Sequence, residues 1–299
     1  MPVVTLAGGR RLSYAQAGPD DGRPVLVLHG AIGSPLRPSP ELAAAIQALG
    51  LRYLMVSRPG FGGSDPSPGR SLVGFAHDLA GLAEVLGLAR VAVVGVSAGG
   101  PYAIACAHAI PDRVAAVATV SSPSPAFRPW AAPGTAPGAR VALATIAAAP
   151  GVTTAVGNVA AGLVRRHPRL LLRAMTLGAD AGDRELLDDP PRAVAAVDGF
   201  LAATATGVGG LMDDYVLSTR PWGFALADVR AEVQLWHGTG DRLVPPVHAV
   251  HLAAGLPRHR LTLAPADGHF FFRRRLLDIL SPLAAALAGP GPGRDATDP

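Results

Sequence analysis

Residues 91–101 read Val-Ala-Val-Val-Gly-Val-Ser-Ala-Gly-Gly-Pro and predict the element around which the chain folds. The valine-rich first half is typical of a strand buried on both faces, and the alanine-rich segment 98–109 is typical of a helix. Gly95 and Gly99 flank Ser97, so the chain can bend tightly there and hold the serine exposed. At a helix N-terminus, free backbone N–H groups favour an oxyanion. The stretch therefore predicts acyl-transfer chemistry, although a plain strand-to-helix turn with an idle serine also fits it.

The composition predicts a globular protein with a sizeable core. The chain has 299 residues, of which 49% are hydrophobic and 16% are charged. This length suits one large α/β domain with an insertion, or two smaller domains. The formal net charge is +4 and no lysine occurs. Arginines gather only in short groups, 165–166 and 273–275, without interleaved aromatic residues, which favours solvated helix surfaces over a nucleic-acid interface.

Cysteine content and hydropathy indicate the compartment. Cys106 is the only cysteine, which excludes an intramolecular disulfide and a cysteine-based metal site. The N-terminus leads directly into strand-like sequence, and the apolar run 91–110 is interrupted by Ser97, two glycines and Pro101. We therefore expect a cytoplasmic protein without a membrane-spanning helix. The sequence carries no signal for an oligomeric state.

Strands and helices alternate on both sides of a long helical segment. This alternation predicts an α/β fold with a mostly parallel, doubly wound central sheet. Residues 124–222 contain several helical patterns broken by proline and glycine, without a strand of comparable strength. We expect residues 1–123 and 223–288 to form the α/β core and residues 124–222 to form a helical cap. The Pro- and Gly-rich residues 289–299 predict a disordered tail.

Two loops beyond this insertion supply an acid and a base. The strand 233–236 runs into a loop that carries Asp241, and the next predicted strand runs into a loop that carries His269. Because catalytic groups of open α/β sheets gather at the carboxyl ends of the strands, we expect these two residues to lie beside Ser97. His269 then acts as the base for Ser97, and Asp241 orients the imidazole ring. Asp267 is the other candidate for the acid.

These motifs together resemble the α/β-hydrolase fold superfamily, with serine, aspartate and histidine in that family's order. The resemblance rests on His29-Gly30, the loop Arg58-Pro59-Gly60-Phe61-Gly62-Gly63-Ser64, the turn 95–99, the acid loop 238–245 and Gly268-His269. It implies an oxyanion hole formed by the backbone N–H groups of Ala31 and Ala98. It also implies a loop-supporting role for His29. Ser97 disfavours relatives with an aspartate nucleophile, and Ser57 departs from the aspartate that many relatives carry.

The expected cap and the histidine loop contribute aromatic side chains. Helix packing accounts for most of them, but we expect Trp130, Tyr215 and Phe270 to line an apolar pocket over Ser97. The pattern favours a serine hydrolase that cleaves a small to medium apolar carboxylic ester through an acyl-enzyme. No cofactor or metal is expected, because no nucleotide-binding glycine fingerprint or metal-ligand cluster occurs. A C–C bond hydrolase, thioesterase or lactonase, or a non-hydrolytic biosynthetic or ligand-binding protein, is the alternative.

Overall fold

A single sheet forms the centre of the molecule. The computed structural model describes residues 1–288 apart from residues 34–37, 126–127, 129–130, 177–178 and 219, so the expected tail 289–299 lies outside the described residues. Within the described part, eight strands follow the order β1-β2-β4-β3-β5-β6-β7-β8. β2 pairs antiparallel with β1 and β4, and the other neighbours pair parallel. The strands are β1 Val3–Thr5, β2 Arg11–Ala17, β3 Arg23–Leu28, β4 Leu51–Val56, β5 Val91–Val96, β6 Val114–Val120, β7 Val233–Gly238 and β8 His259–Ala264.

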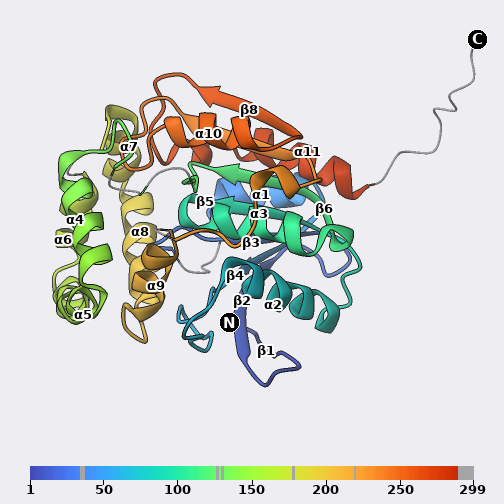
Figure 1. Cartoon of the computed structure of the whole chain (residues 1–299), viewed down its shortest axis with the longest axis horizontal. Coiled ribbons are helices and arrows are strands. Elements are labelled where there is room, and N and C mark those ends of the chain that lie inside the picture. Colours follow the sequence, from blue (N-terminus) through green and yellow to red (C-terminus); the bar gives the residue numbers. More distant parts are fainter. Residues whose placement is uncertain (34–37, 126–127, 129–130, 177–178, 219, 289–299) are drawn as a thin grey trace, which may run out of the picture.

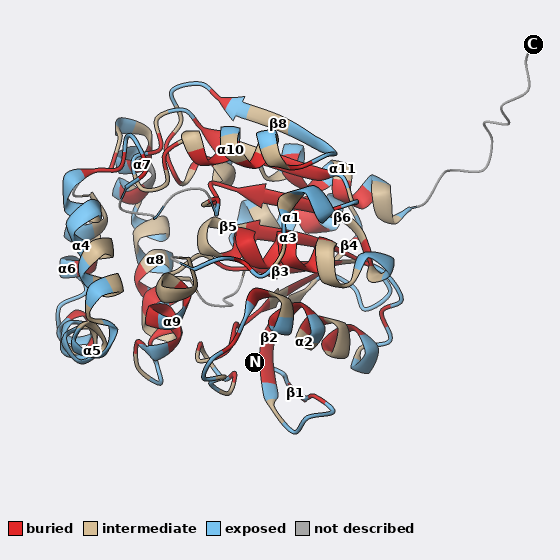
Figure 2. Ribbon diagram, in the orientation of Figure 1, coloured by how far each residue is buried: buried red, intermediate tan, exposed pale blue. Residues whose placement is uncertain are grey.

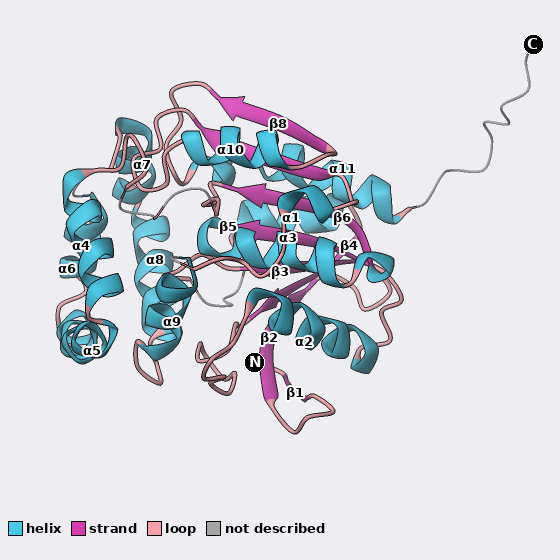
Figure 3. Ribbon diagram, in the orientation of Figure 1, coloured by secondary structure: helices cyan, strands magenta, loops and turns pink. Residues whose placement is uncertain are grey.

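Helices cover both faces of this sheet (Figures 1 and 3), which confirms the expected doubly wound α/β fold. One face carries α2 Leu72–Val85, α3 Gly100–Ala109 and α10 Val247–Gly255, and the other carries α1 Pro40–Ala48 and α11 Leu276–Leu287. Successive side chains of a strand point to opposite faces. Leu26 and Leu28 of β3 therefore pack into the first layer, while Val25 and Val27 pack into the second. Figure 2 shows that the inner strands between these layers are buried, whereas the edge strand β8 is mostly intermediate or exposed.

Serine side chains fix the starts of α1 and α2. The Ser39 hydroxyl accepts a hydrogen bond from the Leu42 N–H at 3.3 Å, and the Ser71 hydroxyl accepts one from the Gly74 N–H at 2.9 Å. Both bonds satisfy backbone donors that a helix leaves free in its first turn. The caps therefore fix the residues at which these two helices begin.

Six helices of the described chain lie between β6 and β7 and stand at the carboxyl ends of the strands (Figure 1). They are α4 Pro137–Ala148, α5 Pro150–Arg166, α6 Arg169–Thr176, α7 Ala181–Asp188, α8 Pro190–Ala203 and α9 Gly209–Ser218. Their buried side chains form an apolar cluster of their own, which includes Phe200, Leu211 and Met212 and meets the core at Phe61. We refer to these helices as the cap. The division of the chain at residues 123 and 223 stays a prediction.

Candidate active site

The turn between β5 and α3 holds Ser97 in a left-handed backbone conformation, with φ at 52°. Residues Ser97–Gly99 form a short 3-10 turn, so the α-helix begins at Gly100 and not at residue 98 as expected. A Cβ atom at Gly95 would lie 2.5 Å from the Gly99 carbonyl oxygen, and one at Gly99 would lie 2.2 Å from the Leu28 carbonyl oxygen. Only glycine fits at both positions. The strained turn, which costs roughly 1–3 kcal/mol, thus points Ser97 out of the sheet.

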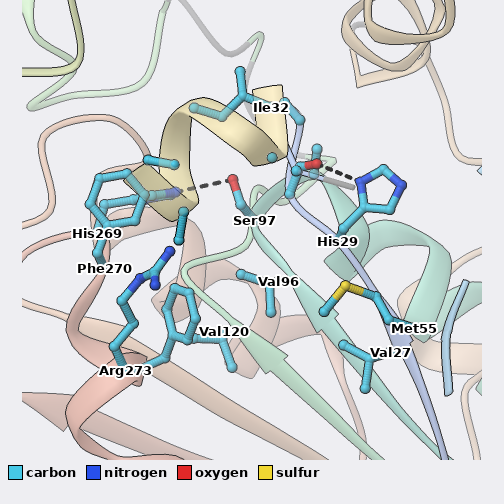
Figure 4. A pocket seen from close by; sticks show the side chains of 18 of the residues that line it. Val27, His29, Ile32, Met55, Val96, Ser97, Val120, His269, Phe270 and Arg273 are labelled. Carbon is cyan, nitrogen blue, oxygen red and sulfur yellow. Dashed lines mark hydrogen bonds between the residues drawn. The ribbon is translucent and has the colours of Figure 1, made fainter. Parts of the chain in front are cut away.

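Ser97, His269 and Asp241 are connected by hydrogen bonds although they lie on three separate loops. His269 Nε2 is 3.1 Å from Ser97 Oγ, and His269 Nδ1 is 2.7 Å from Asp241 Oδ2. Figure 4 shows the bond between Ser97 and His269. A carboxylate can only accept, so Nδ1 carries the proton and Nε2 has a lone pair free for the serine hydroxyl. This arrangement suits removal of a proton from Ser97 Oγ.

The Asp241 carboxylate is buried and held ionised. Its Oδ1 accepts hydrogen bonds from the Leu243 and Val244 N–H groups, both at 2.9 Å. Burial alone would raise the pKa of Asp241, but the charge of His269 and hydrogen bonds from His237 and His269 hold that pKa well below its usual range. The other candidate for the acid, Asp267, has its carboxylate 4.0 Å from Arg274 Nη1, and it is Asp241 that bonds to His269.

The ionised Asp241 also sets the protonation of His269. Burial would lower the pKa of His269, but the negative charge of Asp241 and the hydrogen bond to it outweigh burial and raise that pKa above 6.5. Only neutral His269 can accept a proton from Ser97. Ester hydrolysis, if Ser97 is the nucleophile, is therefore expected to lose kcat/KM as the pH falls through a pKa above 6.5. A kcat/KM profile between about pH 5 and pH 9 measures this limb. A profile that stays flat to its acidic end would contradict the role of His269.

The loop that follows β3 lies against Ser97. A Cβ atom at Gly30 would be 3.5 Å from Ser97 Cβ, and the Gly33 N–H closes the loop by donating to the Gly30 carbonyl at 3.2 Å. His29 donates from Nδ1 to the Gly30 carbonyl at 2.8 Å and accepts from the Arg58 N–H at its Nε2. Burial, with the charge of Arg58, lowers the pKa of His29 to about 3, so the ring is neutral and braces the loop. Oxyanion binding by the N–H groups of Ala31 and Ala98 stays a prediction; both residues line the same cavity as Ser97.

A buried ion cluster connects this loop to α9 of the cap, and the sequence did not reveal it. The Arg58 side chain, fully buried, donates to the carbonyls of His29 and Gly30 and to Asp214 Oδ2 at 2.7 Å. Arg70 donates to Asp214 Oδ1 at 2.6 Å, and the Tyr102 hydroxyl donates to the same oxygen at 2.7 Å. Asp214 thus accepts from three side chains of the core. The cluster couples the position of α9 to the position of the loop beside Ser97.

The cap also holds the histidine loop through α7. The two carboxylate oxygens of Asp183 accept hydrogen bonds from the His269 N–H at 2.7 Å and the Phe270 N–H at 2.8 Å. A Cβ atom at Gly268 would lie 1.7 Å from Asp180 Oδ2, so this loop and α7 pack in close contact. Burial and the nearby Asp180 charge raise the pKa of Asp183. These contacts join residues more than 80 positions apart, so no local sequence motif predicts them.

Ser97 and His269 both line one large cavity. It has a volume of 1360 Å³, above the roughly 300–1,000 Å³ common for small-molecule sites. Its walls come from strands of the core, from α1 and α11, and from α4, α6, α8 and α9 of the cap. Tyr215 and Phe270 line it, and the Phe270 ring stands edge-on to His269 with the ring centres 5.2 Å apart. Trp130, expected in the same pocket, lies outside the described residues.

Two further expectations concern metals and membranes. Among the described side chains, no group of three or more His, Cys, Asp or Glu residues is arranged to hold a metal ion. No helix formed by those residues combines the length and the apolar character that crossing a membrane requires.

Comparison with known proteins places this site in a wider context. Residues 23–273 match the family described as alpha/beta hydrolase fold. The chain is 30% identical over 174 residues to an uncharacterized hydrolase of Bacillus subtilis, covering 58% of this chain and 57% of that protein. It is 31% identical over 223 residues to a pimeloyl-[acyl-carrier protein] methyl ester esterase of Aromatoleum aromaticum, covering 74% of this chain and 81% of that protein. The matches span 57%, 46% and 34% of the first three curated relatives, so about half of their length or less.

A solved structure gives the same architecture. An esterase from Exiguobacterium antarcticum aligns with a TM-score of 0.67 at 18% sequence identity, covering 95% of this chain and 98% of that chain. Likeness at this level of identity concerns the fold. The fold as a whole therefore agrees with a known architecture, while the chemistry has to be argued from the site.

Proposed function

Because the chain belongs to the α/β-hydrolase fold family, we propose that it is a serine hydrolase that cleaves a small to medium carboxylic ester with a largely apolar acyl part. The observation that carries this proposal is the hydrogen-bonded series Ser97, His269 and Asp241, which opens on a mostly apolar cavity. The Aromatoleum relative is named as a methyl ester esterase, which supports an ester as the substrate class.

The reaction follows from the geometry of these groups. Ser97 Oγ attacks the ester carbonyl carbon while its proton passes to His269 Nε2, and the carbonyl oxygen takes up negative charge between the N–H groups of Ala31 and Ala98. The C–O bond to the alcohol then breaks, and the alcohol leaves with the proton from His269. A water molecule, deprotonated by His269, attacks the acyl-enzyme; the bond to Ser97 Oγ then breaks, His269 returns the proton to that oxygen, and the acid is released. Asp241 stabilises the imidazolium that forms in both halves of the reaction.

Hydrolysis of a p-nitrophenyl ester series tests this proposal. The acyl chain is varied from about two to about twelve carbons, and turnover is expected to be highest at an intermediate length because apolar walls surround Ser97. In parallel, a fluorophosphonate probe is expected to label the peptide that contains Ser97 and to abolish turnover in proportion to labelling. Turnover that survives complete labelling, or no turnover and no labelling, would remove the ester hydrolase assignment. Labelling without turnover of any p-nitrophenyl ester would move the search to thioesters, lactones or C–C bonds.

A further inference from the structure

Three consecutive arginines follow the histidine loop, and they differ in what they contact. Arg274 Nη2 lies 2.9 Å from a carboxylate oxygen of Glu185, and Arg275 Nη1 lies 3.3 Å from a carboxylate oxygen of Asp278. Both of these arginines are exposed, as the sequence analysis expected for the whole group. Arg273 differs because it is partly buried and lines the cavity of Ser97. Figure 4 shows its guanidinium group reaching into that cavity on the side of His269 and Phe270.

Arg273 has no carboxylate partner among the described residues. The other charged side chains that line the cavity are paired: Arg192 lies 3.7 Å from Glu41 and 3.6 Å from Asp189, and Asp214 bonds to the buried arginines of the core. Within the described chain, the Arg273 guanidinium takes part in no hydrogen bond or ion pair. Its contact there is a cation–π contact, with Cζ 5.7 Å from the centre of the Phe272 ring.

An unpaired arginine is costly in this environment. Burial, together with the charge of Arg192, lowers the pKa of Arg273, and the charge of Glu41, which itself pairs with Arg192, offsets this lowering only in part. A guanidinium nevertheless stays protonated in proteins, so the group remains a cation. Apolar side chains such as Phe272, Leu276 and Val120 line the same cavity. A buried charge of this kind is stabilised by a counter-charge with matching hydrogen-bond geometry.

We propose that Arg273 binds a carboxylate of the substrate, so that the esters cleaved at Ser97 are half-esters of dicarboxylic acids. This inference rests on the proposed function and names its substrate class. A carboxylate can form two parallel hydrogen bonds with the planar guanidinium, and its single negative charge balances the single positive charge of Arg273. A phosphate dianion would carry one negative charge more than this arginine can neutralise. The apolar walls between Arg273 and Ser97 accommodate the methylene chain that separates the two ends of such a molecule.

Paired substrates test the assignment. The kcat/KM values are measured for monomethyl esters of straight-chain dicarboxylic acids and for methyl esters of monocarboxylic acids of the same chain length. The ratio of the two values reports recognition of the carboxylate, separately from the chemical step that both share. In Arg273→Gln this ratio is expected to fall at least about tenfold, as expected from the loss of one charge-assisted hydrogen-bonded contact. Arg273→Lys, which keeps the charge without the planar fork, is expected to restore part of the ratio.

The neighbouring arginine supplies a matched control. Arg275→Gln removes an exposed arginine two positions away that pairs with Asp278 within α11, and it should leave the ratio unchanged. A further readout does not depend on turnover: hexanoate is titrated calorimetrically into the wild type and Arg273→Gln, and at least about tenfold tighter binding to the wild type is expected.

The outcomes separate this inference from the proposed function. Hydrolysis of both ester classes with a ratio that Arg273→Gln does not change would overturn the carboxylate site and leave the serine hydrolase standing. No hydrolysis of either class, but binding of hexanoate that requires Arg273, would overturn the ester hydrolase and keep the carboxylate site. If neither ester class is hydrolysed and the binding of hexanoate does not depend on Arg273, both are wrong.

Discussion

Replacing Ser97 with alanine is expected to lower kcat for ester hydrolysis by about 10⁵- to 10⁶-fold. The change removes the hydroxyl oxygen that lies 3.1 Å from His269 Nε2. Without it no acyl-enzyme can form, and the base has nothing to activate except water. The cavity and the predicted oxyanion donors, the backbone N–H groups of Ala31 and Ala98, remain, and we expect them to leave a small residual rate above the uncatalysed reaction. Single-turnover assays with p-nitrophenyl esters measure the loss.

A serine outside the site supplies the control for that measurement. Ser281 lies exposed on α11, where its hydroxyl donates to the Leu277 carbonyl at 2.6 Å. Ser281→Ala is expected to keep kcat within about twofold, since surface substitutions of this kind change little. If Ser97→Ala kept more than about 1% of the wild-type kcat while unfolding normally, the acyl-enzyme route would be wrong. Catalysis by a directly activated water would then have to be considered.

The sequence was most informative where a motif follows a buried strand. The glycines around Ser97 predict the tight turn because such a turn brings backbone atoms to where a Cβ atom would otherwise lie, and the structure bears this out at Gly95 and Gly99. Asp241 and His269 could be named because the carboxyl ends of parallel strands meet along one edge. The structure brings all three side chains into hydrogen-bond contact there, and their catalytic roles stay predictions until turnover is measured.

The contacts made by the cap could not be predicted in the same way. Asp183 and Asp214 lie on helices whose sequences predict a helix but not its contacts. Each of them contacts core residues far along the chain. Which face of a cap helix meets which loop depends on packing of the whole insertion, and no local pattern encodes that packing. Arg273 was misread for a related reason. A run of three arginines is typical of a solvated surface, and only the direction of the 3-10 turn Phe271–Arg274 sends the first one inward.

The missed residues share a physical role. Asp214 and Asp183 are both carboxylates of the cap that accept hydrogen bonds from the core, the first beside the loop of Gly30 and the second at the backbone of His269. Each of them therefore holds one side of the predicted catalytic centre. The cap does more than enclose the cavity, because its position and the geometry around Ser97 depend on the same contacts.

Asp214→Ala is expected to lower the free energy of unfolding by about 3–5 kcal/mol. The carboxylate bonds to Arg58 at 2.7 Å and to Arg70 at 2.6 Å, and both arginine side chains are buried. Removing it leaves the buried Arg58 without a counter-charge and leaves Arg70 with only the half-exposed Asp213, and this is the costly way to break a buried ion pair. Burial alone would raise the pKa of Asp214, but the charges of Arg58 and Arg70 lower it below 3.8. Its contribution is therefore fully present at neutral pH and is lost only as the pH falls through this lowered pKa.

Asp213, the adjacent residue on α9, supplies the matched control for Asp214→Ala. Asp213 lies 3.4 Å from Arg70, but its side chain is 52% exposed, so Asp213→Ala is expected to cost less than about 1 kcal/mol. Urea unfolding at neutral pH measures both variants, and Asp214→Asn, which keeps the volume and loses the charge, replaces the alanine variant if that variant does not fold.

Because Arg58 also donates to the carbonyls of His29 and Gly30, Asp214→Ala should lower kcat as well. Similar losses of stability for the two aspartates would show that the buried cluster does not hold the cap. A stability loss confined to Asp214 but without any change in kcat would separate cap attachment from the loop beside Ser97.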